Sequence, residues 1–371
     1  MGPNLDFPRS SLRYETLMTS RGSCFAGLIL TAACASSVPS EPVDSGLSVD
    51  AAVVAPGDAG TGDSAAPIDA PICNSWCDVS TGFAGSFLRV RVAANDLWLV
   101  GSKTSGASGS GSIFRWANGA PVAVGQPVGN SLYDVSVTSE TDIRSVGGSQ
   151  QIAAYHWDGQ TWTADSPSGT LRLAAIWAFG PADVWAGGGD VQDGTGRLFR
   201  KTTAWADQST APTVLPGYAA DFWGASGNLW AVGRVAGHTS SGYIARWDGA
   251  QWATLIDKAT DRLNAIWGSS QSDIWVVGDG GLVYHFDGKQ WSLSPRPDRA
   301  NLSAIWGTSA NDVWAAGSDA GFASGVVIHW NGSTWKDESP TTNSQLRGVG
   351  AIGKTLVVAG SGGTILKKTV E

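Results

Sequence analysis

The chain of 371 residues carries a net charge of −8, and only 15% of its residues are charged. It contains 49 glycines and 19 tryptophans, a composition that favours turns and flat aromatic packing over long helices. The sequence has no stripe of lysine or arginine that could displace counterions from a phosphate backbone, so we expect no nucleic-acid partner.

Residues 1–33 have the features of a signal peptide. Residues 24–33 form an apolar core that follows Arg21 and is too short to span a membrane as a mature helix. We expect translation to start at Met18, because the segment before it contains acidic residues, which a positive n-region avoids. The chain is therefore predicted to be exported.

The end of this leader, Leu30-Thr31-Ala32-Ala33-Cys34, resembles the bacterial lipobox, in which small residues precede a cysteine that becomes lipidated. The leucine stands four residues before the cysteine, one more than in the commonest form. The resemblance implies a lipid on Cys34 that anchors the protein to a membrane of the bacterial cell envelope, at the outer membrane or the periplasmic or cell surface. The alternative is an ordinary small-residue cleavage site without a lipid.

Residues 34–72 are predicted to form the lipidated cysteine and a disordered acidic tether. Residues 35–72 contain six acidic residues, no basic residue and no aromatic one, and such a segment cannot offset the entropy cost of ordering. Cys73 and Cys77 follow the tether. A disulfide between them requires a bend, because in one straight strand they would stand roughly 13 Å apart. Two free thiols are the alternative.

A repeat occupies most of the chain after residue 73. The segment Leu302-Ser-Ala-Ile-Trp-Gly-Thr-Ser-Ala-Asn-Asp-Val-Trp-Ala-Ala-Gly317 aligns with Leu263-Asn-Ala-Ile-Trp-Gly-Ser-Ser-Gln-Ser-Asp-Ile-Trp-Val-Val-Gly278. Seven copies are found, and the position of the second tryptophan is occupied in them by Trp98, Arg144, Trp185, Trp230, Trp275, Trp314 and Val357. The spacing averages about 43 residues, the length of a four-stranded propeller blade.

The second half of the repeat contains Asp-Gly or Asn-Gly between two apolar runs, as in Val327-Ile-His-Trp-Asn-Gly-Ser-Thr-Trp335. This is the strongest short-range signal for a hairpin, because the turn needs positive φ. Each repeat is therefore predicted to form four short antiparallel strands. Residues 73–371 are accordingly predicted to form an all-β domain, a seven-bladed β-propeller.

All 19 tryptophans fall into four columns, one for each strand of the repeat, so none is left for a dedicated site. If Ala310 and Asn311 form the tip of the first hairpin, Gly307 lies opposite Trp314, and Trp306 points to the other face. Large apolar groups on both faces would be buried between neighbouring blades. Each indole ring would hide on the order of 200 Å², worth at most roughly 5 kcal/mol.

The two halves of the repeat, Ile-Trp-Gly-x-Ser-x-x-Asp-Val-Trp-x-x-Gly and His-Trp-Asp-Gly-x-x-Trp, resemble the Trp-rich propeller repeats of bacterial lipoproteins over nearly all of residues 73–371. That family is largely uncharacterised, so the resemblance implies the fold and no established activity. The repeat is also distantly similar to the Asp-box of sialidase-type propellers. No segment has the order Ser-x-Asp-x-Gly-x-Thr-Trp, so the similarity implies no catalytic residue.

Two columns of polar residues in the repeat are candidates for a catalytic or metal-binding site. Three histidines share a column with arginines, which predicts solvent-facing strand positions rather than ligands: His156, His285 and His329, with Arg115 and Arg246. Aspartates form the other column, at the first hairpin, where a carboxylate can accept hydrogen bonds from turn amides: Asp96, Asp142, Asp183, Asp273 and Asp312. A glycosidase needs two specific carboxylates rather than a ring of equivalent ones. Metal-ligand spacings and a nucleophile elbow are absent from the sequence. We therefore predict no catalytic residue, no cofactor, no metal and no enzyme.

The function that fits these features is a non-catalytic binding scaffold for protein or peptide partners, and we expect a monomer. A glycan-binding lectin is the first alternative, because aromatic faces between blades can stack on sugars. A glycoside hydrolase or lyase is the second, and it would need paired acids that project into the central channel.

The seventh repeat provides only three strands, near residues 346–350, at 355–360 and at 364–369. The segment that precedes the first repeat, Asn74-Ser-Trp-Cys-Asp-Val-Ser80, is similar to a fourth strand, Ser333-Thr-Trp-Lys-Asp-Glu-Ser339. An open ring would leave two unpaired strand edges. We therefore predict that residues 74–79 pair antiparallel with residues 364–369 and complete the blade, with Trp76 buried.

Overall fold

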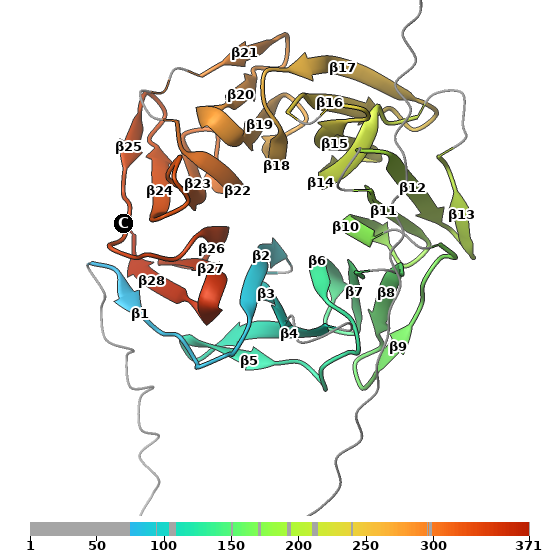
Figure 1. Cartoon of the computed structure of the whole chain (residues 1–371), viewed down its shortest axis with the longest axis horizontal. Helices are drawn as coiled ribbons and strands as arrows, with labels where there is room; N and C mark the ends of the chain where they lie inside the picture. Colours follow the sequence, from blue (N-terminus) through green and yellow to red (C-terminus); the bar gives the residue numbers. More distant parts are fainter. Residues whose placement is uncertain are drawn as a thin grey trace, which may run out of the picture. The chain divides into compact units, whose positions relative to one another are not determined.

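Seven four-stranded antiparallel sheets follow one another around a ring, which confirms the predicted seven-bladed propeller (Figure 1). The computed structural model describes residues 75–370, except for 94, 104–108, 150, 170–171, 191–193, 210–213, 239, 295 and 297–298. The predicted signal peptide, Cys34, the tether and Cys73 lie outside the described residues. No helix in the described part is long and apolar enough to cross a membrane. The described residues also form two 3-10 turns, η1 (Asp279–Gly281) and η2 (Ser361–Gly363).

Each blade runs from a first strand near the ring centre to a fourth strand at the rim, and blades 1 to 7 are numbered here by their first strands in chain order. The first strands are β2 (Ser86–Ala93), β6 (Leu132–Ser139), β10 (Arg172–Gly180), β14 (Gly217–Ala225), β18 (Leu263–Ser270), β22 (Asn301–Ser309) and β26 (Leu346–Ile352). The second strands are β3 (Asp96–Lys103), β7 (Asp142–Gly147), β11 (Asp183–Gly189), β15 (Asn228–Val235), β19 (Asp273–Gly278), β23 (Asp312–Ser318) and β27 (Thr355–Gly360).

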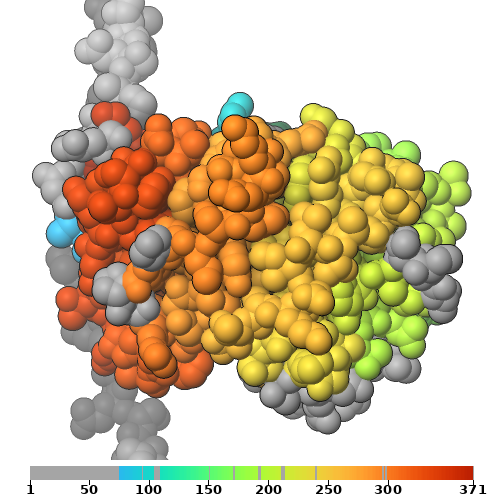
Figure 2. All heavy atoms as spheres, turned by 90° about the horizontal axis from the view of Figure 1, so that it is seen from above, coloured from blue at the N-terminus to red at the C-terminus, as the bar shows by residue number. Residues whose placement is uncertain are grey.

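The third and fourth strands of the blades also follow chain order, except that β1 (Cys77–Asp78) is the fourth strand of blade 7. The third strands are β4 (Ser110–Ala117), β8 (Ala153–Trp157), β12 (Gly196–Lys201), β16 (Gly242–Trp247), β20 (Val283–Phe286), β24 (Gly325–Trp330) and β28 (Ile365–Thr369). The fourth strands are β5 (Ala120–Ala123), β9 (Trp162–Ala164), β13 (Trp205–Asp207), β17 (Trp252–Ala259), β21 (Trp291–Leu293), β25 (Trp335–Asp337) and, in blade 7, β1 (Cys77–Asp78). Seen from the side, the blades of the second half of the chain lie in direct contact along the wall of the ring (Figure 2).

Blade 7 combines the two ends of the described chain, as predicted. Cys77 pairs with Lys367 in the antiparallel ladder between β1 and β28, and the backbone N–H of Val79 donates to the carbonyl of Ile365 at 3.0 Å. Trp76 is half-buried rather than fully buried, and it directly precedes the outermost strand β1. Its indole N–H donates to the carbonyl of Glu338 in blade 6 at 2.8 Å. The closure therefore joins blade 7 to its neighbour as well as to the chain terminus.

The register of the first hairpin differs from the prediction by one residue. Trp306 lies opposite Trp314, and Gly307 lies opposite Val313, so the two tryptophans point to the same face. The cause is a β-bulge between Gly307 and Ser309, which leaves Thr308 as the extra residue. The same shift occurs between Gly268 and Ser270 in blade 5. The predicted placement of these tryptophans on opposite faces is therefore wrong.

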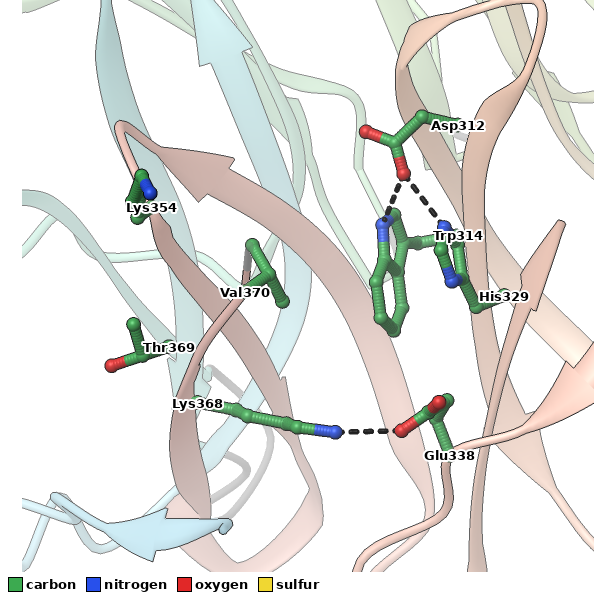
Figure 3. Close-up of a pocket in the computed structure, with 8 residues that line it drawn as sticks. All are labelled: Asp312, Trp314, His329, Glu338, Lys354, Lys368, Thr369 and Val370. Carbon is green, nitrogen blue, oxygen red and sulfur yellow. Dashed lines mark hydrogen bonds and ion pairs between the residues drawn. The ribbon is translucent and has the colours of Figure 1, made fainter. Parts of the chain in front are cut away.

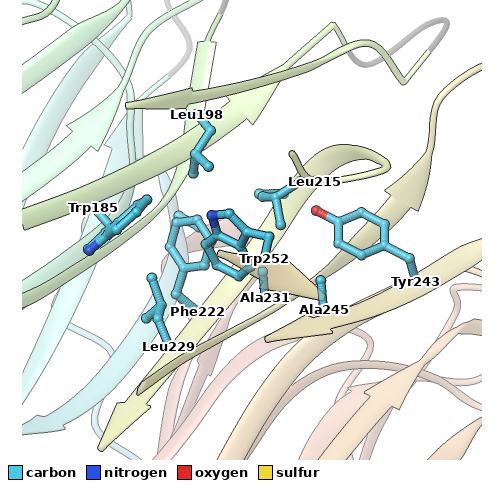
Figure 4. Packing of buried hydrophobic residues seen from close by; sticks show 11 residues of the cluster. Trp185, Leu198, Leu215, Phe222, Leu229, Ala231, Tyr243, Ala245 and Trp252 are labelled. Carbon is cyan, nitrogen blue, oxygen red and sulfur yellow. The ribbon is translucent and has the colours of Figure 1, made fainter. Parts of the chain in front are cut away.

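The tryptophans of one blade pack against those of the next. Between blades 3 and 4, Trp185 meets Trp252 edge to face, with ring centroids 5.7 Å apart (Figure 4). The ring of Trp185 also lies 5.1 Å from that of Trp247. Trp275 of blade 5 makes the equivalent contacts with Trp330 and Trp335 of blade 6. Such aromatic pairs add about 0.5–1.5 kcal/mol to the energy of burial. The blade interfaces therefore hold the ring together.

Candidate functional site

The aspartate and histidine columns of the repeat bind each other. Nε2 of His285 lies 2.7 Å from Oδ1 of Asp273, and Nε2 of His329 lies 2.7 Å from Oδ1 of Asp312. The same contact between the second and third strands recurs in the pairs Asp96–Arg115, Asp142–His156, Asp183–Arg200 and Asn228–Arg246. The three histidine side chains keep only 22–28% of their surface exposed. They are half-buried rather than fully open to solvent, because each one packs against an aspartate of the neighbouring strand.

In every pair except Asp142–His156, the third-strand side chain also covers the second-strand tryptophan; in blade 2 that position holds Arg144. The His329 ring stacks on Trp314 with a centroid distance of 3.9 Å and an angle of 8° between the planes. The Arg200 guanidinium lies 4.8 Å from the centroid of Trp185 in blade 3. A cation or imidazole that is bonded to a carboxylate and stacked on an indole is held rigidly. The aspartate column and the column of histidines and arginines therefore stabilise the blades.

Three aspartates of this column, Asp142, Asp273 and Asp312, accept a hydrogen bond from the hydroxyl group of the extra residue at a β-bulge. The hydroxyl of Thr308 donates to Asp312, and the hydroxyl of Ser269 donates to Oδ2 of Asp273 at 2.5 Å. The prediction that turn amides are their partners is wrong, since that role belongs to the aspartates of the Asp-Gly turns. Oδ1 of Asp158, for example, accepts the backbone N–H groups of residues 160 and 161 at 2.8 Å. These bonds lower the pKa of Asp158.

Hydroxyl, carboxylate and imidazole are the groups of a hydrolytic triad, but their arrangement here is different. A nucleophile needs a hydrogen bond to the base that takes its proton, and the base is oriented by the acid. In blade 5 the Ser269 hydroxyl and the His285 imidazole bind the two oxygens of the same carboxylate, that of Asp273. The carboxylate therefore separates the hydroxyl from the base.

A pocket of about 660 Å³ lies between blades 6 and 7 (Figure 3). Its wall includes the Asp312–His329 pair and Lys368, whose ammonium lies 2.6 Å from Oε2 of Glu338. Trp314 also lines the pocket, but its side chain is only 4% exposed and is covered by His329. An open aromatic face for stacking on a sugar is therefore lacking on Trp314.

Four charged side chains meet at the ring centre. Arg91 of blade 1 donates to both carboxylate oxygens of Asp134 in blade 2, at 3.0 and 2.8 Å, and to Asp221 of blade 4 at 2.5 Å. Arg89 lies 3.3 Å from Asp134 and 3.5 Å from Asp221. Blades 1 and 4 stand on opposite sides of the ring, so these contacts bridge the central channel (Figure 1). Burial alone would lower the pKa of Arg91, but the two carboxylates outweigh it and raise the pKa.

The two aspartates of this channel cluster are paired acids on the channel wall, but they are not open to a substrate. Asp134 is 0% exposed and Asp221 is 1% exposed. Each also accepts backbone N–H groups, since Oδ2 of Asp134 binds Ile176 N at 3.0 Å and Oδ2 of Asp221 binds Ile266 N at 3.0 Å. With their lone pairs occupied, these acids tie the first strands of the blades together.

An open cavity of about 330 Å³ lies at one mouth of the channel. Its lining comes from blades 3, 4, 5 and 7, and consists of Arg172, Tyr218, Ala220, Arg234, Arg262, Leu263, Asn264 and Arg347. The channel cluster reaches its floor, because Arg89 donates to the carbonyl of Ala220 at 3.1 Å. The cavity lies where the first strands begin, at the opposite end of the blades from the Asp–His hairpins. Among the residues that the structure describes, four guanidinium groups and no carboxylate line it.

Sequence reasoning missed both the channel cluster and the arginines of the mouth. Asp134 and Asp221 occupy a first-strand position that holds Ala265 and Ala304 in other repeats. An aspartate at a position where other repeats have alanine could have indicated the channel cluster from the sequence. Of the sequence-predicted site residues, Cys77 is disulfide-bonded, and Cys73 lies outside the described residues, so the pairing of these two stays a prediction. Groups of three or more metal-binding side chains are not found within the described ranges.

Neither a protein-family model nor a curated protein matches this chain. Many solved structures do match it, and they include β-propellers. YCF48 bound to D1 peptide aligns with a TM-score of 0.58 at 17% identity, over 80% of this chain and 98% of that chain. A catalytically inactive virginiamycin B lyase from Staphylococcus aureus, with quinupristin, aligns with a TM-score of 0.61 at 15% identity, over 80% of this chain and 99% of that one.

The WD40 β-propeller domain of Doa1 aligns with a TM-score of 0.55 at 13% identity, over 81% of this chain and 97% of that chain. At these identities the likeness concerns the fold. Structure and comparisons together define the chain as a seven-bladed all-β propeller, and the similar proteins include both binding proteins and a lyase.

Proposed function

We propose that this chain is an exported, lipid-anchored surface propeller that acts as a non-catalytic binding scaffold for protein or peptide partners. The observation that carries this proposal is the open cavity at the channel mouth, which sits above a channel bridged by buried ion pairs. A shallow cavity on a rigid ring can hold a segment of a partner, whereas the buried acids beneath it cannot reach a substrate. The structural similarity to YCF48, which was solved with a bound peptide, supports a peptide ligand.

The alternatives have less support. A lectin that stacks sugars on tryptophan needs an exposed indole face. All 19 tryptophans lie in the described part of the chain, and each is buried or half-buried. A hydrolase needs two carboxylates at the substrate, while Asp134 and Asp221 are covered and bound by arginine.

Binding of the mature chain to a peptide array and to a glycan array distinguishes these functions. The Cys34→Ser variant, produced without its leader, gives a soluble protein for both arrays. The proposal predicts binding to a subset of peptides and none to glycans. Binding to glycans alone would establish the lectin instead, and release of products from an arrayed glycan would establish the hydrolase.

The lipid anchor rests on the sequence before Cys34 and has its own test. Cell fractionation of the wild type should place the protein in the membrane fraction, and Cys34→Ser should move it to the soluble fraction. Mass spectrometry of the wild type should find a lipid on Cys34. A wild-type cysteine that is unmodified, together with a variant that stays membrane-bound, contradicts the anchor.

A further inference from the structure

We infer that the arginine-lined mouth binds the carboxylate groups of an acidic peptide segment. This inference rests on the proposed function and names the chemistry of its ligand. It follows from the arginines of the cavity at the channel mouth, from the absence of a carboxylate partner for Arg172 and Arg347 among the described residues, and from the size of the cavity.

Arg347 of blade 7 is the least compensated of these cations. Its side chain donates to the neutral amide oxygen of Gln345 at 2.9 Å, and its buried Nε lacks a hydrogen-bond partner. Burial lowers the pKa of Arg347, and no charged group in the described part of the chain offsets that effect. A half-buried guanidinium without a carboxylate is costly, so such a group is retained most readily where a ligand supplies the counter-charge.

Arg172 of blade 3 is held in place by aromatic rings. Its guanidinium carbon lies 4.9 Å from the centroid of Tyr133 and 5.8 Å from that of Tyr218. The buried Nε of Arg172 also lacks a hydrogen-bond partner. Burial alone would lower the pKa of Arg172, but its interactions with Tyr218 and Tyr133, hydrogen bonds included, outweigh burial and raise the pKa. A neutral tyrosine brings no negative charge, so the guanidinium is oriented in advance for a ligand.

The other two arginines of the mouth, Arg234 and Arg262, have partners of their own. Asp279 lies close enough to Arg262 to interact with its charge, and Asn264 donates to Asp279 at 2.8 Å. Burial is the larger effect on Asp279 and raises its pKa. Arg234 donates to the backbone carbonyl of Asp190 at 3.2 Å. The excess positive charge is therefore concentrated at Arg172 and Arg347.

The shape of the cavity selects a small oxyanion on an extended chain. Its volume of about 330 Å³ is at the lower end of the range for ligand pockets, so it admits the tip of one chain and not a folded loop. Guanidinium groups bind carboxylates through two parallel hydrogen bonds, which gives both affinity and orientation. Since residues 35–72 and the ring as a whole carry no basic stripe, the positive charge of the mouth is local and does not suit a nucleic-acid backbone.

The test uses fluorescence anisotropy with two labelled peptides and the full mature chain carrying Cys34→Ser. One probe is Gly-Gly-Asp-Asp with a free C-terminal carboxylate, and the other is Gly-Gly-Asn-Asn with an amidated C-terminus. We expect the acidic probe to bind at least about tenfold more tightly, and Arg347→Gln or Arg172→Gln to weaken its binding at least about tenfold. Raising the salt concentration should weaken binding further.

Arg197→Gln is the matched control, because Arg197 is exposed on β12, outside the mouth. It should leave the affinity unchanged. Thermal unfolding shows whether each variant folds, and Arg347→Gln should unfold at the same temperature as the wild type or higher, since it removes an uncompensated cation.

The inference is overturned if the two probes bind with equal affinity, or if Arg347→Gln and Arg172→Gln leave binding of the acidic probe intact. In that case, peptide binding on the array would still support the scaffold function. If inorganic phosphate displaces the acidic probe at a much lower concentration than acetate does, the site is a phosphate site and the assignment to carboxylates is wrong. If neither the array nor the probes detect a bound peptide, the scaffold function fails as well.

Discussion

Replacing Asp134 by asparagine should destabilise the ring more than the loss of any surface ion pair. The carboxylate of Asp134 is completely buried, bonds to Arg91 through both oxygens and accepts the N–H of Ile176. Asparagine has the same shape, but its amide NH₂ would face these donors. The buried guanidinium groups of Arg89 and Arg91 would also lose one of the two carboxylates that balance their charge. Removal of one partner of a buried pair costs about 3–5 kcal/mol.

The size of the effect can be read as a change in melting temperature. At about 2.1 cal/mol/K per residue, a ring of roughly 300 residues has an unfolding entropy of about 0.6 kcal/mol/K, so Asp134→Asn should lower the Tm by about 5–8 °C. Circular dichroism and tryptophan fluorescence would both follow the transition.

The exposed pair Arg197–Asp207 provides the control, with 3.7 Å between its charged atoms and 43% and 45% of the two side chains exposed. Asp207→Asn should change the stability by about 0–1 kcal/mol. If Asp134→Asn lowers the Tm no more than Asp207→Asn does, the channel cluster does not hold the blades together, and the role assigned to it is refuted.

Three further changes test the packing, the closure and the paired columns. Trp185→Ala should cost about 3–5 kcal/mol in thermal unfolding, because the ring is 1% exposed between blades 3 and 4; a loss below 1 kcal/mol would contradict the interface. Deleting residues 73–80 should cost about 2–4 kcal/mol, since it exposes the edge of β28, whereas deleting residues 35–72 should leave the Tm unchanged. Burial opposes ionisation of Asp273, but the hydrogen bonds it accepts, the largest from His285, outweigh burial and lower its pKa below 3.8. A lowered folded-state pKa contributes stability above the unfolded value that is lost as the pH falls, so the destabilisation by Asp273→Asn should be full at pH 7 and shrink below about pH 4.

The repeat made the fold readable from the sequence, because each strand has its own tryptophan position. The absence of a fourth strand in the seventh repeat, together with the spare strand around Trp76, was enough to predict the pairing of β1 with β28. The strand register of the first hairpin was predicted wrongly. A count from the hairpin tip assumes a regular ladder, and the bulge at Thr308 breaks it by one residue.

The functional features were harder to predict because they depend on residues that depart from the repeat. Arg172, Arg262 and Arg347 belong to different repeats and meet only because the starts of the first strands converge on the ring axis. The Asp–His pairs escaped prediction for another reason: the two columns lie on adjacent strands, and side-chain pairing across strands follows from the register.

Photo-crosslinking tests most directly whether the channel mouth is the binding site. An acidic peptide that carries a diazirine beside its aspartates would be irradiated with the mature chain, and the crosslinked residues identified by mass spectrometry. Binding at the mouth predicts crosslinks to Tyr218 and Asn264, which line the cavity, and their loss in Arg347→Gln. Crosslinks at Glu338 or Lys354, in the pocket between blades 6 and 7, with none at the mouth, would contradict the account.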